Sequence, residues 1–256
     1  MKLKRSIIWI LLLALCLTLP IGCAASAEQN ETDAGLTGTP GLEYKLTSDG
    51  ASYICTGIGN AATTDIVIPA TYNGKPVILV AGNAFYNCVT LTSVVIEEGV
   101  QAIEMYAFRG CVRLKSVSIP GSVMMVADRA FTGCTSLETV IIADNGQVFE
   151  KPEEDVRLIG ESVFKGCTAL KEIRLPEEIT LLSRRALDAC SSLEELTLPA
   201  NLLAIDEAAL AGCSSLKKLY FQGTKEEWSK LPKGMLWDVD IEGCVVVCTD
   251  GETSMN

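Results

Sequence analysis

Apolar and polar positions follow one another along most of this chain in a pattern that repeats every 23 residues. The repeat is marked by six cysteines, which are Cys88, Cys111, Cys134, Cys167, Cys190 and Cys213. Four of the five intervals between them are 23 residues long, and the third is 33. Alanine or valine lies four residues before each cysteine, phenylalanine or leucine three before, leucine three after, and valine, isoleucine or leucine six after. Agreement over this many columns predicts a solenoid of stacked coils.

Each repeat changes its local period midway. Ala107 and Phe108, with Cys111 and Leu114, are spaced i, i+1, i+4 and i+7, which predicts one apolar face of a short helix. The positions that begin at Val117 alternate with period two, which predicts a strand. One coil buries too little apolar surface to offset the entropy of ordering it, so the coils must stack. The predicted fold class is an α/β repeat: a solenoid of about six 23-residue coils with a parallel sheet on one face.

The strand segments resemble the leucine-rich repeat, whose L-x-x-L-x-L core is matched by Leu91-Val94-Ile96, Leu137-Val140-Ile142 and Leu193-Leu196-Leu198. The 23-residue spacing, the Ala-Phe-x-x-Cys segment and the Ile-Pro strand exit are similar to the BspA-type subclass of bacterial surface proteins. Residues 44–77 and 223–251 resemble the usual N-terminal entry and C-terminal exit of that family. The resemblance covers about residues 43–251. It implies β-rich caps at both ends and adhesion to proteins of a host or a neighbouring cell.

The beginning of the chain predicts export. A basic start at residues 2–5 precedes thirteen almost wholly apolar residues, 7–19, a run too short to span a bilayer. Two processing sites remain open. Cleavage before Cys23, at a stretch resembling a bacterial lipobox, would attach a lipid to Cys23, whereas cleavage after residue 27 would release the protein without one. Either site leaves the mature protein outside the cytoplasm, lipid-anchored at the cell surface or secreted.

The same patterns divide the chain into segments. We expect an export signal peptide at 1–22 (or 1–27 with the alternative cleavage), a flexible acidic tether at 23–42, an N-terminal β cap at 43–65, the repeat array at 66–221 and a C-terminal cap at 222–256. An acidic insertion at 144–155 interrupts the array and accounts for its one long interval.

Composition narrows the range of functions. The chain has no histidine, which excludes catalytic systems and zinc sites that depend on imidazole. With 21 Lys+Arg against 32 Asp+Glu, its net charge of −11 argues against binding nucleic acid. Adjacent carboxylates such as Glu177 and Glu178 diverge along an extended chain instead of converging as a hydrolase dyad would. We therefore expect no enzyme, no catalytic residue, no metal ligand and no cofactor.

One alternative concerns cations. Asp144-Asn145-Gly146 begins like a calcium-binding loop but lacks the later ligand positions. Whether the acidic insertion binds a cation is therefore left open, with a plain surface loop as the favoured interpretation.

The cysteine column has two interpretations, a metal or redox ladder and a row of buried thiols. The repeats contain no C-x-x-C spacing, and equivalent side chains in a stack point in parallel rather than toward one another. This favours thiols that are buried and inert. The disulfide state of Cys55, Cys244 and Cys248, which lie in the predicted caps, is not determined by the sequence.

The outward positions of the predicted strands form the candidate binding surface. Seven strands about 4.8 Å apart would make a face about 30 Å across, which suits a protein domain or an extended chain. The candidate contact residues are Val95, Ser118, Ile141, Glu172, Arg174, Thr197, Lys218 and Tyr220. Exposed apolar and aromatic groups beside an arginine are typical of interface anchors.

We therefore predict an exported, monomeric module that binds a protein or glycan ligand through this face. It would contact a membrane only through a lipid at Cys23. The alternative is a structural or accessory protein of the cell envelope that has no external ligand.

Overall fold

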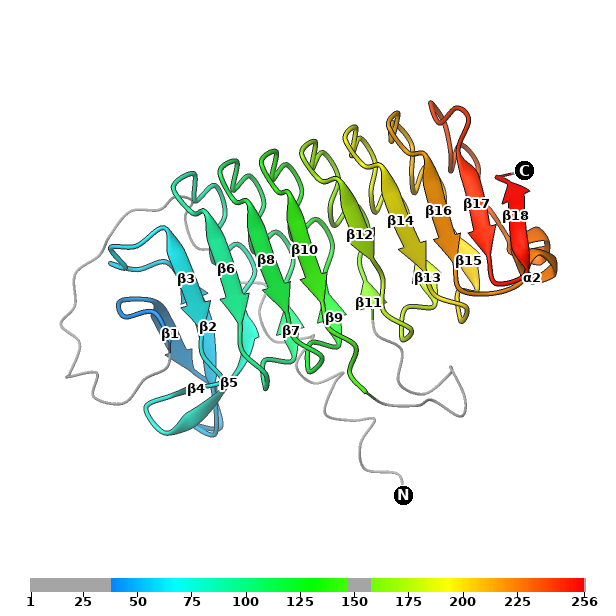
Figure 1. Cartoon of the computed structure of the whole chain (residues 1–256). Coiled ribbons are helices and arrows are strands. Elements are labelled where there is room, and N and C mark those ends of the chain that lie inside the picture. Colours follow the sequence, from blue (N-terminus) through cyan, green and yellow to red (C-terminus); the bar gives the residue numbers. More distant parts are fainter. Residues whose placement is uncertain (1–37, 147–157, 256) are drawn as a thin grey trace, which may run out of the picture.

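The structure is a computed structural model that describes residues 38–146 and 158–255. These residues form a long solenoid of about eight coils of about 23 residues (Figure 1). Most coils begin with a strand in a second row and end with a strand on a first face. Within a coil, a turn edge connects the second-row strand to the face strand that follows it, so that β9 (Met125–Val126) and β10 (Thr139–Ile142) belong to one coil and β11 (Leu158–Ile159) and β12 (Glu172–Arg174) to the next. The predicted solenoid with a parallel sheet is confirmed.

The face strands lie side by side in chain order (Figure 1). They are β3 (Asp65–Ile68), β6 (Ser93–Ile96), β8 (Ser116–Ile119), β10 (Thr139–Ile142), β12 (Glu172–Arg174), β14 (Glu195–Leu198), β16 (Lys218–Phe221) and β17 (Val245–Cys248). The strands β3, β6, β8 and β10 form one parallel sheet, and β12, β14, β16 and β17 are parallel in a second. In β6, Val94 and Ile96 are buried while Val95 is exposed, which confirms the predicted period of two. We call the outward surface of these strands the sheet face.

The second row contains mostly two-residue strands. They are β5 (Lys75–Val80), β7 (Ala102–Ile103), β9 (Met125–Val126), β11 (Leu158–Ile159), β13 (Leu181–Leu182) and β15 (Ala204–Ile205). The strands β5, β7, β9 and β11 pair in parallel, and β13 pairs with β15. Ile103, Val126 and Leu182 point inward from this row and are buried.

The short helix predicted for each coil does not form. Among the described residues the one helix is α2 (Lys225–Lys230), near the C-terminal end. On the turn edge the amide of Phe85 donates to the carbonyl of Ala107 in the next coil, at 2.7 Å, instead of bonding within a helix. Left-handed residues such as Tyr106 (φ 63°) and Gly110 (φ 74°) also interrupt any helical run. The helix-like apolar spacing is therefore produced by consecutive turns whose amides bond from coil to coil.

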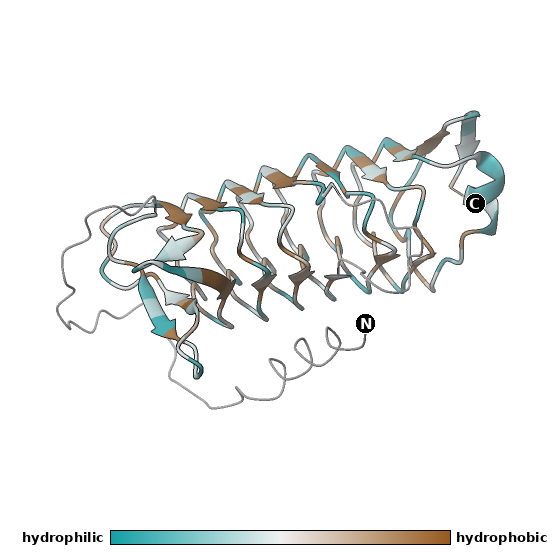
Figure 2. Ribbon diagram, turned by 90° about the horizontal axis from the view of Figure 1, so that it is seen from below, coloured by the Kyte–Doolittle hydropathy of each residue, from teal (hydrophilic) through white to brown (hydrophobic). Residues whose placement is uncertain are grey.

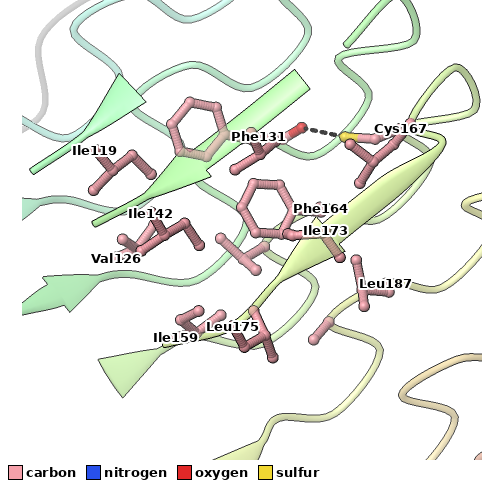
Figure 3. Close-up of a cluster of buried hydrophobic side chains, with 14 of the residues drawn as sticks. Ile119, Val126, Phe131, Ile142, Ile159, Phe164, Cys167, Ile173, Leu175 and Leu187 are labelled. Carbon is pink, nitrogen blue, oxygen red and sulfur yellow. Dashed lines mark hydrogen bonds between the residues drawn. The ribbon is translucent and has the colours of Figure 1, made fainter. Parts of the chain in front are cut away.

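The inner columns stack into one continuous core. The rings of Phe85, Phe108, Phe131 and Phe164 lie one above another, with centroids 4.9, 5.0 and 5.6 Å apart in that order. Leu187 continues the column beyond Phe164 (Figure 3). The third step of the ring stack is the widest and the most tilted, at 17° against 0° and 2° for the first two.

The N-terminal end of the core is covered by β1 (Glu43–Leu46), β2 (Tyr53–Gly57) and β4 (Thr71–Tyr72). Tyr44 stacks on Tyr72 with centroids 4.1 Å apart, and Tyr53 meets Tyr72 edge-on at 5.0 Å. The strands at this end contain both hydrophilic and hydrophobic segments (Figure 2). Covering the first coil in this way keeps its apolar face out of water.

The C-terminal end is covered by α2 and by β18 (Gly251–Ser254), which pairs antiparallel with β17. Thr224 and Glu227 form a capping box at the start of α2. Trp228 is the buried residue of this helix, and its indole N–H donates to the carbonyl of Ser254 at 3.3 Å. The last coil is thus covered by a helix and a returning strand.

Candidate binding face

The structure places all eight predicted contact residues on the outward surface of the sheet. Their strands are β6 for Val95, β8 for Ser118, β10 for Ile141, β12 for Glu172 and Arg174, β14 for Thr197, and β16 for Lys218 and Tyr220. Ile141 is 57% exposed and Val95 is 43% exposed, large values for aliphatic side chains in a sheet. Ser118, Thr197 and Tyr220 are half-buried between neighbouring strands.

The sheet face changes its chemistry along the solenoid. From β3 to β10 its outward residues are hydroxyl-bearing or aliphatic, apart from Asp65. The carboxylate of Asp65 accepts hydrogen bonds from the hydroxyls of Ser93 and Thr92, both at 2.6 Å, and these bonds lower its pKa. From β12 to β16 the outward residues include Glu172, Arg174, Glu195 and Lys218. The face therefore has a nearly uncharged half and a charged half.

The two halves meet where the parallel ladder is interrupted. At neighbouring junctions the amide of Lys115 donates to Thr92 O at 2.8 Å, and that of Lys217 donates to Glu194 O at 3.0 Å. The equivalent amide of Lys171 makes no such bond to Glu138 within the described ranges, and β10 is not paired with β12. We call this junction the seam. It coincides with the acidic insertion between β10 and β11.

The seam reaches the core but does not separate the coils. Val140 and Ile142 are each 8% exposed, whereas Val117 and Ile119 in the preceding strand are 1% and 0% exposed. The same two coils stay joined in the second row, where β9 pairs with β11. They also stay joined on the turn edge, where the thiol of Cys167 donates to Phe131 O at 3.4 Å (Figure 3).

A hollow of about 350 Å³ opens on the sheet face at the seam. Its rim carries Glu138, Thr139, Ile141, Glu172, Arg174, Glu195 and Thr197. Four of the eight predicted contact residues, Ile141, Glu172, Arg174 and Thr197, therefore lie together around one cavity. Val95, Ser118, Lys218 and Tyr220 lie outside it on other strands or positions.

The hollow has an excess of negative charge. Glu172 and Glu195 are register partners on neighbouring strands, and Glu138 approaches from the other side of the seam. None of these three carboxylates forms an ion pair with another described residue. Arg174 is the cationic residue of the rim, and its Nη1 lies 3.3 Å from Asp144 Oδ2. Like charges on neighbouring strands repel, so the hollow favours a positively charged occupant.

Three of the rim residues, Glu138, Thr139 and Glu195, were not among the predicted contact residues. The sequence did contain a signal for them, since the interval of 33 residues falls directly after Ile142. Treating the insertion as a loop beside an unbroken sheet missed its effect, which is that β12 does not pair with β10.

The cysteine column is buried, as the sequence predicted. The thiols of Cys111, Cys134, Cys190 and Cys213 donate to carbonyls of the preceding coil at 3.0–3.2 Å. Burial raises the pKa of Cys111 and of Cys213 to about 12 and that of the intervening thiols well above 9.0. Thiolate is the reactive form, so these thiols are unreactive in the folded state.

Cys88 departs from the expectation for the column, because it is disulfide-bonded. Cys55, Cys244 and Cys248, whose state was left open, are free thiols. Burial raises the pKa of Cys55 to about 12 and that of Cys244 to about 11.

Within the described part of the chain, no three Cys, Asp or Glu side chains are grouped so that they could hold a metal ion. Asp144 faces Arg174, and the amide of Asn145 donates to Glu178 Oε1 at 2.9 Å. The rest of the acidic insertion, from 147 on, lies outside the described residues. The possible cation site therefore remains untested.

The described residues include no helix long and apolar enough to cross a membrane. The predicted export signal, the processing sites at Cys23 and after residue 27, and residues 23–37 of the predicted tether lie outside the described residues. Export and anchoring accordingly remain predictions from the sequence.

Comparison with solved structures identifies similar solenoids. A leucine-rich-repeat protein of T. pallidum is 27% identical over 80% of this chain and 86% of its own, with a TM-score of 0.63. A leucine-rich cell surface protein of Faecalibacterium prausnitzii is 17% identical over 82% of this chain and 99% of its own, with a TM-score of 0.42. A comparison with curated proteins gives no significant match.

A family model described as the BspA type leucine rich repeat region matches residues 78–153 and 147–241 in six copies. The matched segments cover more than half of the chain, and they include the coils marked by the six repeat cysteines and the seam. The resemblance seen in the repeat columns is therefore confirmed: this chain belongs to the BspA-type leucine-rich-repeat family.

Proposed function

We propose that this protein is an exported cell-surface module that binds a protein or glycan ligand through its sheet face. The observation that carries the proposal is the exposure of Ile141 and Val95 on a face that also presents Arg174 and Tyr220. Arginine and tyrosine are enriched among the residues that contribute most to protein interfaces, and exposed aliphatic groups beside them add apolar contact area. The proposal assigns no catalytic chemistry, no cofactor and no nucleic-acid ligand to the chain.

The architecture supports such a role. Backbone hydrogen bonds on the face, in the second row and along the turn edge hold the backbone of the face strands in place, so little backbone entropy is lost when a ligand binds. The basic and apolar start of the chain supports export, with either a lipid on Cys23 or release after residue 27.

The test is binding of the protein to a panel of extracellular-matrix proteins and glycans before and after the double substitution Val95→Arg and Tyr220→Ala. These residues lie outside the hollow, so the variant tests the face as a whole. The matched control is Val112→Arg with Tyr86→Ala, which changes an exposed valine and a half-buried tyrosine away from the sheet face.

We expect the face variant to lose most of its binding and the control to keep it, with equal thermal stability in both. Equal binding by both variants would refute the sheet face as the contact surface. Failure of the unmodified protein to bind any panel member would favour the alternative, an accessory envelope protein.

A further inference from the structure

The hollow at the seam is a feature of this chain's own geometry, because it exists where β12 does not pair with β10. Its volume of about 350 Å³ is at the small end of the range of ligand pockets, which is roughly 300–1,000 Å³. A cavity of this size takes one long side chain and its neighbours rather than a folded domain. Lys171 directly precedes Glu172 of the rim, and its amide, which makes no bond to Glu138 within the described ranges, offers a donor to the main chain of an extended ligand.

The charge of the rim selects the chemistry of the occupant. Glu138, Glu172 and Glu195 contribute three carboxylates without ion pairs among the described residues, while Arg174 is engaged with Asp144. An anionic glycan or an acidic peptide would add to the repulsion. A lysine or arginine would relieve it, since it supplies the missing positive charge and hydrogen-bond donors.

The apolar part of the rim also suits a lysine or arginine side chain of a ligand. Ile141 is 57% exposed beside the carboxylates, with Thr139 on the same strand and Thr197 across the seam. Long basic side chains pack their methylene stems on apolar surface while the charged end reaches a polar partner. The hollow thus offers an aliphatic wall for the stem and carboxylates for the charged end.

We propose that the hollow at the seam receives a lysine or arginine side chain from an extended segment of a partner protein. This inference rests on the proposed function and specifies the ligand as a basic, extended polypeptide. The carboxylates of Glu172 and Glu195 bind the charged end, and Ile141 contacts the stem.

The test selects ligands without assuming their sequence. A phage-displayed library of random peptides is enriched on the protein, and the selected peptides are synthesised and titrated by fluorescence anisotropy. The variant Glu172→Gln with Glu195→Gln removes both charges with little change of shape. The matched control, Glu242→Gln with Glu252→Gln, removes two exposed carboxylates from the C-terminal end.

We expect the selected peptides to contain lysine or arginine and to bind the hollow variant about tenfold more weakly or worse, with the control unchanged. Their affinity should also fall as salt is raised, because screening weakens the attraction. Selection of no peptide, of peptides without basic residues, or of peptides that bind the hollow variant normally would overturn the inference. If Val95→Arg with Tyr220→Ala abolishes matrix binding while Glu172→Gln with Glu195→Gln does not, the sheet face stands and only the hollow's role fails.

Discussion

The two halves of the sheet face, on either side of the seam, share their inner residues and differ in their outer ones. Val117 in β8 and Leu196 in β14 are both buried at equivalent positions. Their outward neighbours are Ser116 and Ser118 in β8 but Glu195 and Thr197 in β14. Packing constrains the inner columns to a narrow set of shapes, whereas the outer positions are free to change. We therefore expect the residues that contact a ligand in the outer columns, whose side chains change from nearly uncharged to charged at the seam.

The seam also shows how a coil array tolerates ten additional residues. The face ladder stops between β10 and β12, whereas the second row continues from β9 to β11 and stops only between β11 and β13. The two interruptions are offset by one coil, so no junction loses both ladders. The coil that contains β11 and β12 is held to the preceding coil by the second row and to the following coil by the face.

The largest expected effect is a loss of folding stability at alkaline pH, caused by the buried cysteine column. Because this column extends along the coils of both halves, its effect can be compared on the two sides of the seam. The pKa of Cys111 and of Cys213 is about 12 in the folded state, against an ordinary value of 9.0. A raised pKa means that the contribution to stability is complete below pH 9 and is lost as pH rises toward 12. Each thiol should then lower the free energy of unfolding by about 1.4 kcal/mol per pH unit within that window.

Urea denaturation at several pH values between 8 and 11 measures this slope. Cys111→Ala, before the seam, and Cys213→Ala, after it, should each make the slope shallower by a similar amount, although both also lower stability at pH 8. Comparing variants cancels the titration of lysines and tyrosines, which all of them share. A slope that neither substitution changes would contradict the burial of these thiols.

The second effect compares the core within a regular stack and at the seam. Phe108 has a parallel ring on each side, at 4.9 and 5.0 Å, whereas Phe164 has one, at 5.6 Å. Phe108→Ala should lower the free energy of unfolding by about 3–5 kcal/mol. Phe164→Ala should cost about 0.5–1.5 kcal/mol less, because fewer ring contacts are lost.

Chemical denaturation of the two variants gives these values directly, provided that the denaturant dependence matches that of the unmodified protein. An equal or larger loss at Phe164 would mean that the seam does not loosen the core beneath it.

The sequence predicted the parts of this structure that repeat. Columns such as Phe85 to Phe164 predicted the coil length, the inward side of each strand and the burial of the cysteines. They did so because residues that recur at the same position of each repeat pack in the same way in every coil. The turn edge was predicted as helix because apolar spacing does not reveal where backbone amides bond. Tyr106 and Arg129 adopt left-handed backbone conformations, which the sequence does not indicate because neither residue is glycine or asparagine. The sequence did not predict the hollow for a related reason. The hollow depends on which strands pair, and the interval of 33 residues does not show which pairing is lost.

The last and most local prediction concerns one backbone amide and requires no substitution. Lys115, Lys171 and Lys217 each follow the same leucine of their coil, but the amides of Lys115 and Lys217 are bonded to the preceding coil and that of Lys171 is not. Hydrogen exchange resolved to single residues should therefore find the Lys171 amide exchanging about tenfold faster, or more, than the other two. Because all three are lysines at equivalent positions, differences in intrinsic exchange are small. Equal protection at Lys171 would mean that the ladder is closed in solution, and the hollow that depends on its interruption would then be closed as well.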